Sequence, residues 1–172
     1  MKNKFNKEII FALYYNKAND TGHGYWYSTT KPEEAQLTQP APVFRALYDA
    51  RDNRLPLISE YTEDKKGTYL LNKWFDNRND ALKGNVVEND FPHLRYADVV
   101  LMYAEALAES GSSLGDALVW LNKTRTRAGL DALRTEDIPS KGAFIEALAD
   151  ERGREFALEG HRWFDLVRLG LA

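Results

Sequence analysis

The segment from Phe91 to Glu109 restricts the possible folds of this chain more than any other, because its sequence is apolar on two sides. Alanine and leucine recur in it, and neither glycine nor proline follows Pro92, which predicts a helix over about 93–109. At helical spacing, one narrow stripe carries all of its charges. The stripe consists of Arg95, Asp98, Met102, Glu105 and Glu109. A helix that is apolar on both flanks is buried on both flanks, so the sequence predicts a helix in the middle of a helical stack.

Three more helices are predicted downstream, over 115–128, 141–158 and 161–168. The first of them ends at Gly129, the residue type that commonly terminates a helix in the left-handed conformation. Together with the helix of 93–109, it forms a helical hairpin with the dimensions of a TPR unit of about 34 residues. The TPR consensus Trp-x2-Leu-Gly is absent, and a single hairpin of this kind is visible. The sequence therefore favours a TPR-like helical hairpin scaffold.

The first 90 residues have a different character, with short apolar segments between long polar loops. Strands are predicted over Glu8–Tyr15 and over 56–62 and 68–75, the last two joined in a hairpin by Glu63–Gly67. A short helix is predicted over Pro42–Ala50, because proline suits the first turn of a helix. The predicted fold class is therefore mostly α with a small β portion, and a length of 172 residues suits a single domain.

Charge and composition exclude several classes of function. Lysine and arginine are scattered along the sequence, and the net charge is −3. The sequence therefore shows no basic face of the kind that would predict a nucleic-acid partner. The absence of cysteine excludes disulfides and zinc–thiolate sites. The histidines lie far apart, and no phosphate-binding or dinucleotide-binding glycine motif occurs, so we expect neither a metal nor a cofactor. No apolar run approaches the length of about 18 residues that indicates a transmembrane helix.

The helix predicted over 141–158 carries charges on its apolar face. Arg152, Glu155 and Glu159 fall within the arc that also holds Phe144 and Leu148. Glu155 and Glu159 could serve as a pair of acid–base carboxylates in a glycoside hydrolase-like enzyme. A structural ion-pair network is favoured instead, because arginines lie close in sequence and isolated buried charges are costly. The predicted network consists of Arg125, Arg127, Glu151, Arg152, Glu155, Glu159, Arg162 and Asp165, with Arg168 as a further partner.

A run of three aromatic residues in a glycine-containing loop is the best binding signal. Tyr25, Trp26 and Tyr27 are contiguous there, and flat aromatic faces with a polar edge suit amphipathic ligands such as sugars. Trp74, at the end of a predicted strand beside polar residues, is the second ligand-binding candidate. The two remaining tryptophans lie on predicted helices and are expected in the core; they are Trp120 and Trp163.

Three segments of the helical half resemble the hallmark sequences of SusD/RagB-type nutrient-binding lipoproteins. They are Leu94–Ala106 (LRYADVVLMYAEA), Leu121–Leu130 (LNKTRTRAGL) and Glu151–Gly170 (ERGREFALEGHRWFDLVRLG). Their occurrence in the same order makes the resemblance specific, and Glu8–Phe11 and Asp52–Arg54 fit the family more weakly. The resemblance implies a non-catalytic outer-membrane protein at the cell surface, which captures glycans or other nutrients. It also implies a TPR-like scaffold with ligand loops on one face, capping a SusC-type TonB-dependent transporter.

Two departures from the family's pattern predict that the chain is the C-terminal portion of a longer, lipid-anchored protein. The chain lacks the family's N-terminal half, and it lacks the lipidated cysteine. In this interpretation 1–90 form a strand and loop region, and 91–172 form the helical region, of one SusD-like domain. Helix faces meant for the absent half would be uncovered, which predicts self-association. The family's ligand residues follow no fixed motif, so none is transferred to this chain. A hydrolase using Glu155 and Glu159 and a TPR-type protein-interaction scaffold are the alternatives.

Overall fold

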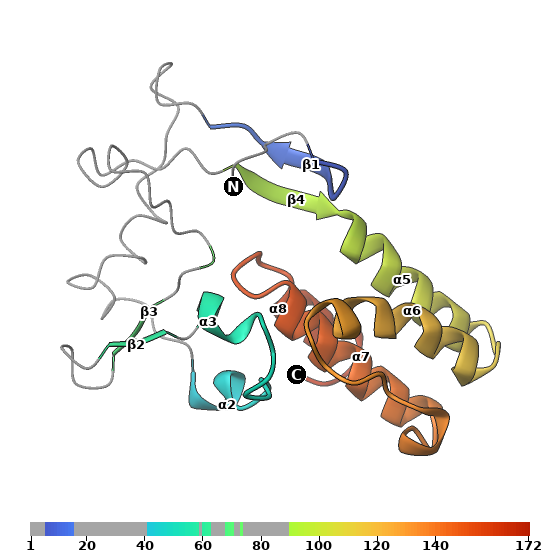
Figure 1. Ribbon diagram of the computed structural model, residues 1–172. Helices are drawn as coiled ribbons and strands as arrows, with labels where there is room; N and C mark the ends of the chain where they lie inside the picture. Colours follow the sequence, from blue (N-terminus) through green and yellow to red (C-terminus); the bar gives the residue numbers. More distant parts are fainter. Residues whose placement is uncertain (1–5, 16–40, 59, 63–67, 71–72, 74–89) are drawn as a thin grey trace. The chain divides into compact units, whose positions relative to one another are not determined.

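The computed structural model describes residues 6–15, 41–58, 60–62, 68–70, 73 and 90–172 (Figure 1). The chain divides into two compact units. The N-terminal unit comprises Met1–Tyr48 and Leu55–His93, and the helical unit comprises Asp49–Arg54 and Leu94–Ala172. Helices predominate among the described residues and the strands are short, which confirms the predicted fold class.

The strands pair in two short sheets. Strand β1 (Ile9–Leu13) pairs with β4 (Phe91–Arg95), whose last residues already belong to the helical unit. Strands β2 (Glu60–Thr62) and β3 (Thr68–Leu70) pair antiparallel, which confirms the hairpin predicted for this part of the chain. The paired parts are shorter than the predicted strands.

Two single-turn helices lie between β1 and β2 in the sequence. Helix α2 (Pro42–Arg45) begins at its proline, as predicted, but ends well before Ala50. Helix α3 (Leu55–Ile58) occupies the first half of the strand predicted over 56–62, so that part of the prediction is wrong. Pro56 lies in the first turn of α3, where a residue without an N–H group loses no helical hydrogen bond.

The helical unit is built on a hairpin of two helices. Helix α5 (Tyr96–Glu109) packs along α6 (Leu114–Arg127), and α7 (Lys141–Glu155) packs against both (Figure 1). The 3₁₀ turn η4 (Thr135–Asp137) precedes α7, and α8 (Arg162–Arg168) packs on α7 after a tight turn.

Local signals set the ends of these helices. The side chains of Ser113 and Ser140 accept hydrogen bonds from the backbone N–H groups of Asp116 and Ala143, at the first turns of α6 and α7. Gly129 follows α6 with a φ of 82°, the left-handed conformation predicted for it. These signals explain why the bounds of α6 lie within one residue of the predicted 115–128.

The core of the helical unit lies where α5, α6 and α7 meet. Its largest fully buried apolar side chains are Leu101, Leu121, Phe144 and Leu148. Alanines on the facing sides of α5 and α6 allow the two helices to approach closely; they are Ala97, Ala104, Ala108 and Ala117. Burial of one large apolar side chain stabilises a fold by about 1.5–3 kcal/mol, so this cluster fixes the hairpin against α7.

Two helix ends differ from the prediction. The helix expected from residue 93 begins at Tyr96, because Phe91–Arg95 is extended and paired as β4. A proline disfavours the helical conformation of the residue before it, which fits the extended conformation of Phe91, the first residue of β4. The helix expected to reach Leu158 ends at Glu155, and Leu158 itself has a φ of 64°, which no α-helix accommodates.

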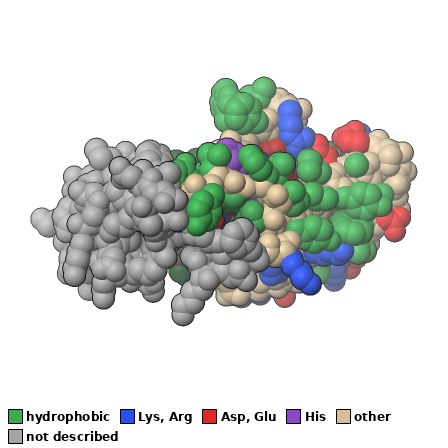
Figure 2. Space-filling view, turned by 90° about the horizontal axis from the view of Figure 1, so that it is seen from above, with side chains coloured by type: hydrophobic (Ala, Val, Ile, Leu, Met, Phe, Trp, Pro, Cys, Tyr) green, Lys and Arg blue, Asp and Glu red, His purple; other side chains and the backbone are tan. Residues whose placement is uncertain are grey.

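Helix α5 is buried on one flank and exposed on the other. Val100 is buried, but Tyr96 and Tyr103 are 51% and 47% exposed, with Val99 and Met102 exposed beside them. The prediction of burial on both flanks is therefore only half correct for the described residues. We call Tyr96, Val99, Met102 and Tyr103 the exposed α5 face. Figure 2 shows hydrophobic side chains reaching the surface beside charged ones.

Two tryptophans of the helical unit have different surroundings. Trp163 on α8 is 66% exposed, so its prediction as a core residue is wrong. The buried position on this short helix belongs to Asp165 instead. Trp120 is partly buried, and its ring meets the ring of Tyr103 edge-on with the centroids 4.7 Å apart.

Candidate functional site

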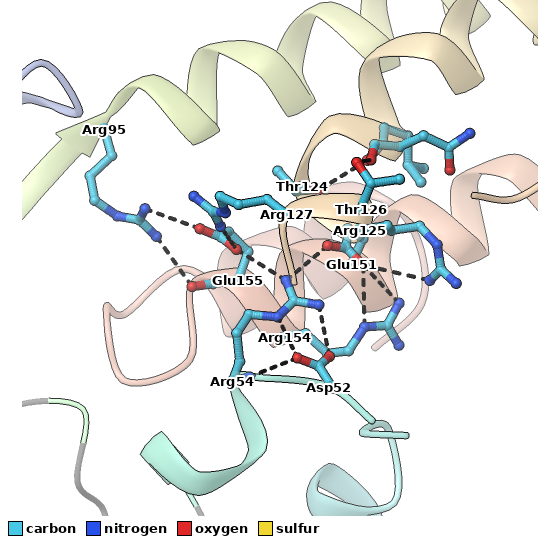
Figure 3. Close-up of polar contacts among 12 residues, drawn as sticks. Asp52, Arg54, Arg95, Thr124, Arg125, Thr126, Arg127, Glu151, Arg154 and Glu155 are labelled. Carbon is cyan, nitrogen blue, oxygen red and sulfur yellow. Dashed lines mark hydrogen bonds and ion pairs between the residues drawn. The ribbon is translucent and has the colours of Figure 1, made fainter. Parts of the chain in front are cut away.

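Carboxylates at the C-terminal end of α7 gather arginines from several segments of the chain (Figure 3). Glu151 and Glu155 lie about one helical turn apart and point in the same direction. Nη1 of Arg54 lies 2.8 Å from Glu151 Oε1 and 3.0 Å from Glu155 Oε2. The same guanidinium donates from Nε and Nη2 to the carboxylate of Asp52, at 2.9 and 2.8 Å. A single arginine thus connects the turn before α3 to two positions of α7.

Glu151 is fully buried, and its other oxygen faces two more arginines. Arg154 donates to Oε2 at 3.1 Å, and Nη1 of Arg125, from α6, lies 3.7 Å from it. The pKa of Arg125 lies below its ordinary value, mainly because burial disfavours the charged guanidinium. The negative charge of Glu151 raises this pKa, but the positive charges of Arg154 and Arg54 lower it further. A buried carboxylate is tolerated only with such partners, so this cluster stabilises the contact between α6 and α7.

Glu155 and Glu159 both bind Arg95, the residue directly before α5. Nη1 of Arg95 lies 3.1 Å from Glu155 Oε1, and its Nε lies 2.8 Å from Glu159 Oε2. Arg127, in the last turn of α6, binds Oε2 of Glu155. The Arg95 guanidinium also lies over the ring of Phe156, with Cζ 5.0 Å from the centroid. With Arg54 included, arginines from three separate segments of the chain bind Glu155.

These contacts determine the protonation state of Glu155. Burial raises its pKa, but the charges of Arg95, Arg127 and Arg54, together with the hydrogen bond from Arg127, outweigh burial and lower it to about 2. For Arg95, burial lowers the pKa, and the bonds and charges of Glu159 and Glu155 raise it above its ordinary value. Both groups are therefore charged at neutral pH, and Glu155 has no proton to give to a leaving group.

A second cluster joins α7 to α5 and α8. Nη1 of Arg152 lies 2.7 Å from Asp98 Oδ1, and its Nε lies 2.8 Å from Asp165 Oδ2. All three side chains are buried. Arg168 donates to the other oxygen of Asp165 at 2.8 Å, so both carboxylate oxygens of this α8 residue accept hydrogen bonds from arginine.

The polar stripe predicted on α5 faces α7 and α8, and its charged members are paired there. The pairs are Arg95 with Glu159, Asp98 with Arg152, Glu105 with Arg168, and Glu109 with Lys141. The stripe is therefore a seam of ion pairs, which explains how one helix can carry charges between two apolar flanks.

The predicted network residues are mostly members of these clusters. Those that the structure brings together are Arg125, Arg127, Glu151, Arg152, Glu155, Glu159 and Asp165. Arg162 has other contacts: its Nη1 donates to the Ala149 carbonyl at 2.6 Å, and its Nη2 lies 3.6 Å from Asp150 Oδ1. Sequence reasoning missed several members, namely Asp52, Arg54, Arg95, Asp98 and Arg154. The one signal for the first two was the resemblance of Asp52–Arg54 to the family.

A recess beside these charges does not contain the candidate catalytic pair. A cavity of about 450 Å³ lies between α5, α7 and α8. Its lining residues are Asp98, Met102, Glu105, Ala106, Glu109, Arg152 and Arg168. Glu155 and Glu159 are not among them, and both are buried against arginines. This geometry speaks against a hydrolase that uses these two carboxylates.

The candidate ligand-binding residues Tyr25, Trp26, Tyr27 and Trp74 lie outside the described residues. In the part of the chain that is described, no group of histidine and acidic side chains is arranged to hold a metal ion. Within the same ranges, no helix combines the length and apolarity needed to cross a membrane.

A family model described as the SusD family matches residues 52–172. The chain belongs to the SusD family. The match begins at Asp52 and therefore includes every member of the ion-pair clusters described above. This result confirms the family predicted from the three hallmark segments of the sequence.

Individual SusD relatives are considerably longer than this chain. The starch-binding protein SusD of Bacteroides thetaiotaomicron is 34% identical over 102 residues, which are 58% of this chain and 17% of that protein. The surface glycan-binding protein A of Bacteroides uniformis matches in structure with a TM-score of 0.61 and 28% identity, over 77% of this chain and 29% of that one. A SusD superfamily protein of Bacteroides vulgatus matches with a TM-score of 0.71 and 26% identity, over 99% of this chain and 42% of that one. The chain thus spans less than half the length of each of these relatives.

Proposed function

We propose that this chain is the C-terminal portion of a SusD-like protein that binds glycans or related nutrients without changing them chemically. Membership of the SusD family carries the proposal. Two of the relatives reported above are named for the binding of starch and of glycans. The parent protein would be lipid-anchored at the cell surface in the outer membrane, and it would deliver its ligand to a SusC-type TonB-dependent transporter.

Binding without catalysis agrees with the chemistry of the helical unit. A glycoside hydrolase needs one carboxyl group that holds a proton near neutral pH and a second carboxylate beside the same bond. The arginines around Glu155 lower its pKa to about 2. A general acid needs a shift in the opposite direction, to a pKa that is raised toward neutral pH. Glu159 is buried, and both of its oxygens accept hydrogen bonds from Arg95. We assign both carboxylates to the scaffold.

Aromatic side chains within the first 90 positions of the chain would hold the ligand. Tyr25, Trp26 and Tyr27 supply adjacent rings beside glycines, and Trp74 supplies another. Three consecutive side chains of a loop diverge in direction, so they cannot all enter one core. Trp26 has the broadest face and is our first candidate for stacking on the apolar side of a sugar ring.

A glycan panel tests this proposal, with affinity read by calorimetry on the parent protein and on the chain alone. Trp26→Ala should weaken binding of the preferred glycan by about tenfold, which corresponds to the roughly 1.4 kcal/mol expected of one stacked ring. Trp163→Ala is the matched control, because it replaces the same type of residue at an exposed position of α8 that does not belong to the proposed platform. Equal affinity of Trp26→Ala and wild type would exclude this loop and leave Trp74 as the candidate. A parent protein that binds no member of a broad panel would overturn the proposal.

A further inference from the structure

The cavity between α5, α7 and α8 is lined only by residues of the helical unit, and most of its charges are fully paired. Arg168 donates to both carboxylate oxygens of Glu105, and Lys141 binds Glu109 at the rim. A volume of about 450 Å³ suits a small ligand. The chemistry of such a ligand depends on the two remaining charged residues of the lining, Asp98 and Arg152.

Asp98 has one carboxylate oxygen without a protein partner. Its Oδ1 accepts a hydrogen bond from Nη1 of Arg152 at 2.7 Å, whereas its Oδ2 accepts none from the residues that the structure describes. Asp98 is only 5% exposed. A buried acceptor without a partner costs free energy, so Oδ2 is available to a ligand in the cavity that Asp98 lines.

Arg152 has an unused donor of the same kind. Its Nε donates to Asp165 at 2.8 Å and its Nη1 donates to Asp98, but its Nη2 donates to no residue in the described part of the chain. The guanidinium also lies over the ring of Phe156, with Cζ 5.0 Å from the centroid. Because these contacts fix its position and Arg152 is only 4% exposed, Nη2 is a preorganised donor beside the cavity.

The unused oxygen and nitrogen belong to one ion pair, so the cavity offers an acceptor and a donor together. A simple cation would bind Oδ2 of Asp98 but would be repelled by Arg152, and a simple anion would meet the opposite problem. A hydroxyl group both donates and accepts, so neighbouring hydroxyls serve both atoms without adding charge. The polar part of the cavity therefore favours a neutral, hydroxylated ligand.

The floor of the cavity is apolar. Met102 and Ala106 follow Asp98 by one and two turns of α5, so they lie on the same side of the helix, and both line the cavity. Both residues are exposed. A thioether and a methyl group suit the apolar C–H face of a sugar ring, whose hydroxyls would then reach Asp98 and Arg152.

We propose that this cavity is a carbohydrate-binding site of the helical unit, which takes a neutral polyhydroxylated ligand the size of a sugar ring. Asp98 accepts from its hydroxyls, Arg152 donates to them, and Met102 and Ala106 contact its C–H face. The site includes none of the aromatic candidates of the first 90 residues, so it does not rest on the proposed function.

Methyl NMR on the full chain tests this proposal, because the sequence contains only two methionines, Met1 and Met102. A chain labelled with ¹³C-methyl methionine gives one signal from the cavity and one internal reference. Titration with methyl β-glucopyranoside and with myo-inositol should shift the Met102 signal saturably, at a protein concentration where sedimentation shows a monomer. If neither polyol shifts it, water alone meets these polar atoms and the proposal is overturned. Propylammonium and propionate should cause no saturable shift, and an equal shift by either ion would overturn the assigned class of ligand.

Two variants of the lining locate the site. Ala106→Leu fills the floor at an exposed position, so it should abolish the shift while circular dichroism shows that the helices are retained. Val119→Leu adds a similar group at an exposed position of α6 and should leave the titration unchanged. Asp98→Asn replaces one oxygen by a donor and should weaken binding at least about tenfold. A wild-type titration in Ala106→Leu would overturn the location even if Asp98→Asn fails to fold.

The Trp26→Ala variant separates this site from the proposed aromatic platform. It should leave the Met102 titration unchanged, because Trp26 is not among the lining residues of the cavity. Loss of the Met102 shift in Trp26→Ala would overturn a separate site. A glycan panel that finds no binding to the parent would refute the proposed function, whereas the Met102 signal decides the cavity on the chain itself.

Discussion

The guanidinium of Arg95 donates from Nε and Nη2 to both carboxylate oxygens of Glu159, at 2.8 and 2.9 Å. This forked pair joins the residue before α5 to the turn after α7, across 64 positions of sequence. Both residues are less than a tenth exposed. Buried, forked ion pairs are costly to break on one side only, which makes the pair a good place to test what holds the helical unit together.

Replacement of Arg95 by lysine should lower the free energy of unfolding by about 1–3 kcal/mol, because lysine keeps the charge but cannot make the fork. Urea unfolding followed by circular dichroism measures the change. Arg134→Lys is the control, since Arg134 pairs with Asp137 at 3.2 Å on an exposed surface. That substitution should cost less than about 0.5 kcal/mol. Equal losses in the two variants would contradict a special role of the buried fork.

The acid stability of the protein should depend on Glu155. Its pKa is about 2 in the folded chain against an ordinary value of 4.5, so folding favours the ionised form. The stabilisation is complete above pH 4.5 and is lost as the pH falls toward 2, and it amounts to roughly 3 kcal/mol. Unfolding free energies of wild type and Glu155→Gln, measured between pH 7 and pH 3, should therefore converge on acidification. A difference that stays constant over this range would refute the assignment.

Gly129 should be less tolerant of substitution than Gly111, although both have a φ of 82°. A Cβ at Gly129 would lie 2.8 Å from the side-chain nitrogen of Asn53, whereas nothing lies within 4 Å at Gly111. Gly111→Ala should cost about 1 kcal/mol, the usual penalty of a left-handed alanine. Gly129→Ala should cost more than Gly111→Ala, because the side chain of Asn53 must move aside for the new Cβ. Equal losses in thermal unfolding would show that the Asn53 side chain moves aside without cost.

The exposed α5 face should cause the isolated chain to self-associate. Apolar side chains that repeat at helical spacing on a surface usually find a partner. Sedimentation velocity over a range of concentrations should show a dimer or larger species, and Tyr96→Glu combined with Val99→Glu should shift the protein to the monomer. Val119→Glu, at an isolated exposed valine of α6, is the control and should leave the association unchanged. A wild-type chain that stays monomeric at high concentration would contradict the prediction.

The parts of the fold that were predictable from sequence are those set by neighbouring residues. Helix α6 lies within one residue of its predicted bounds because Ser113 and Gly129 mark its ends locally. Helix α3 and strand β4 were missed because pairing and packing with distant segments determine them, and local preference for strand or helix does not. Pro56 was compatible with both conformations.

The same distinction applies to the ion pairs. The arginines near Glu151 and Glu155 in the sequence were predicted as partners, because a charged residue on an apolar helix face demands one. Arg54 was missed as a partner, since 97 residues separate it from Glu151. The periodicity of a single helix says which side chains need partners, but only the packing of the chain shows which distant segment provides them.

Strand β4 continues into helix α5 without an intervening loop, since one ends at Arg95 and the other begins at Tyr96. The junction therefore has no slack in which to absorb a change of length. One residue inserted between these two positions, with Arg95 still bound to Glu159, would rotate α5 by about 100° about its axis. Leu101 would turn out of the core, and the charges of α5 would lose their partners on α7 and α8. Insertions and deletions should thus be excluded at this junction and tolerated elsewhere, such as at the Ser110–Ser112 turn after α5.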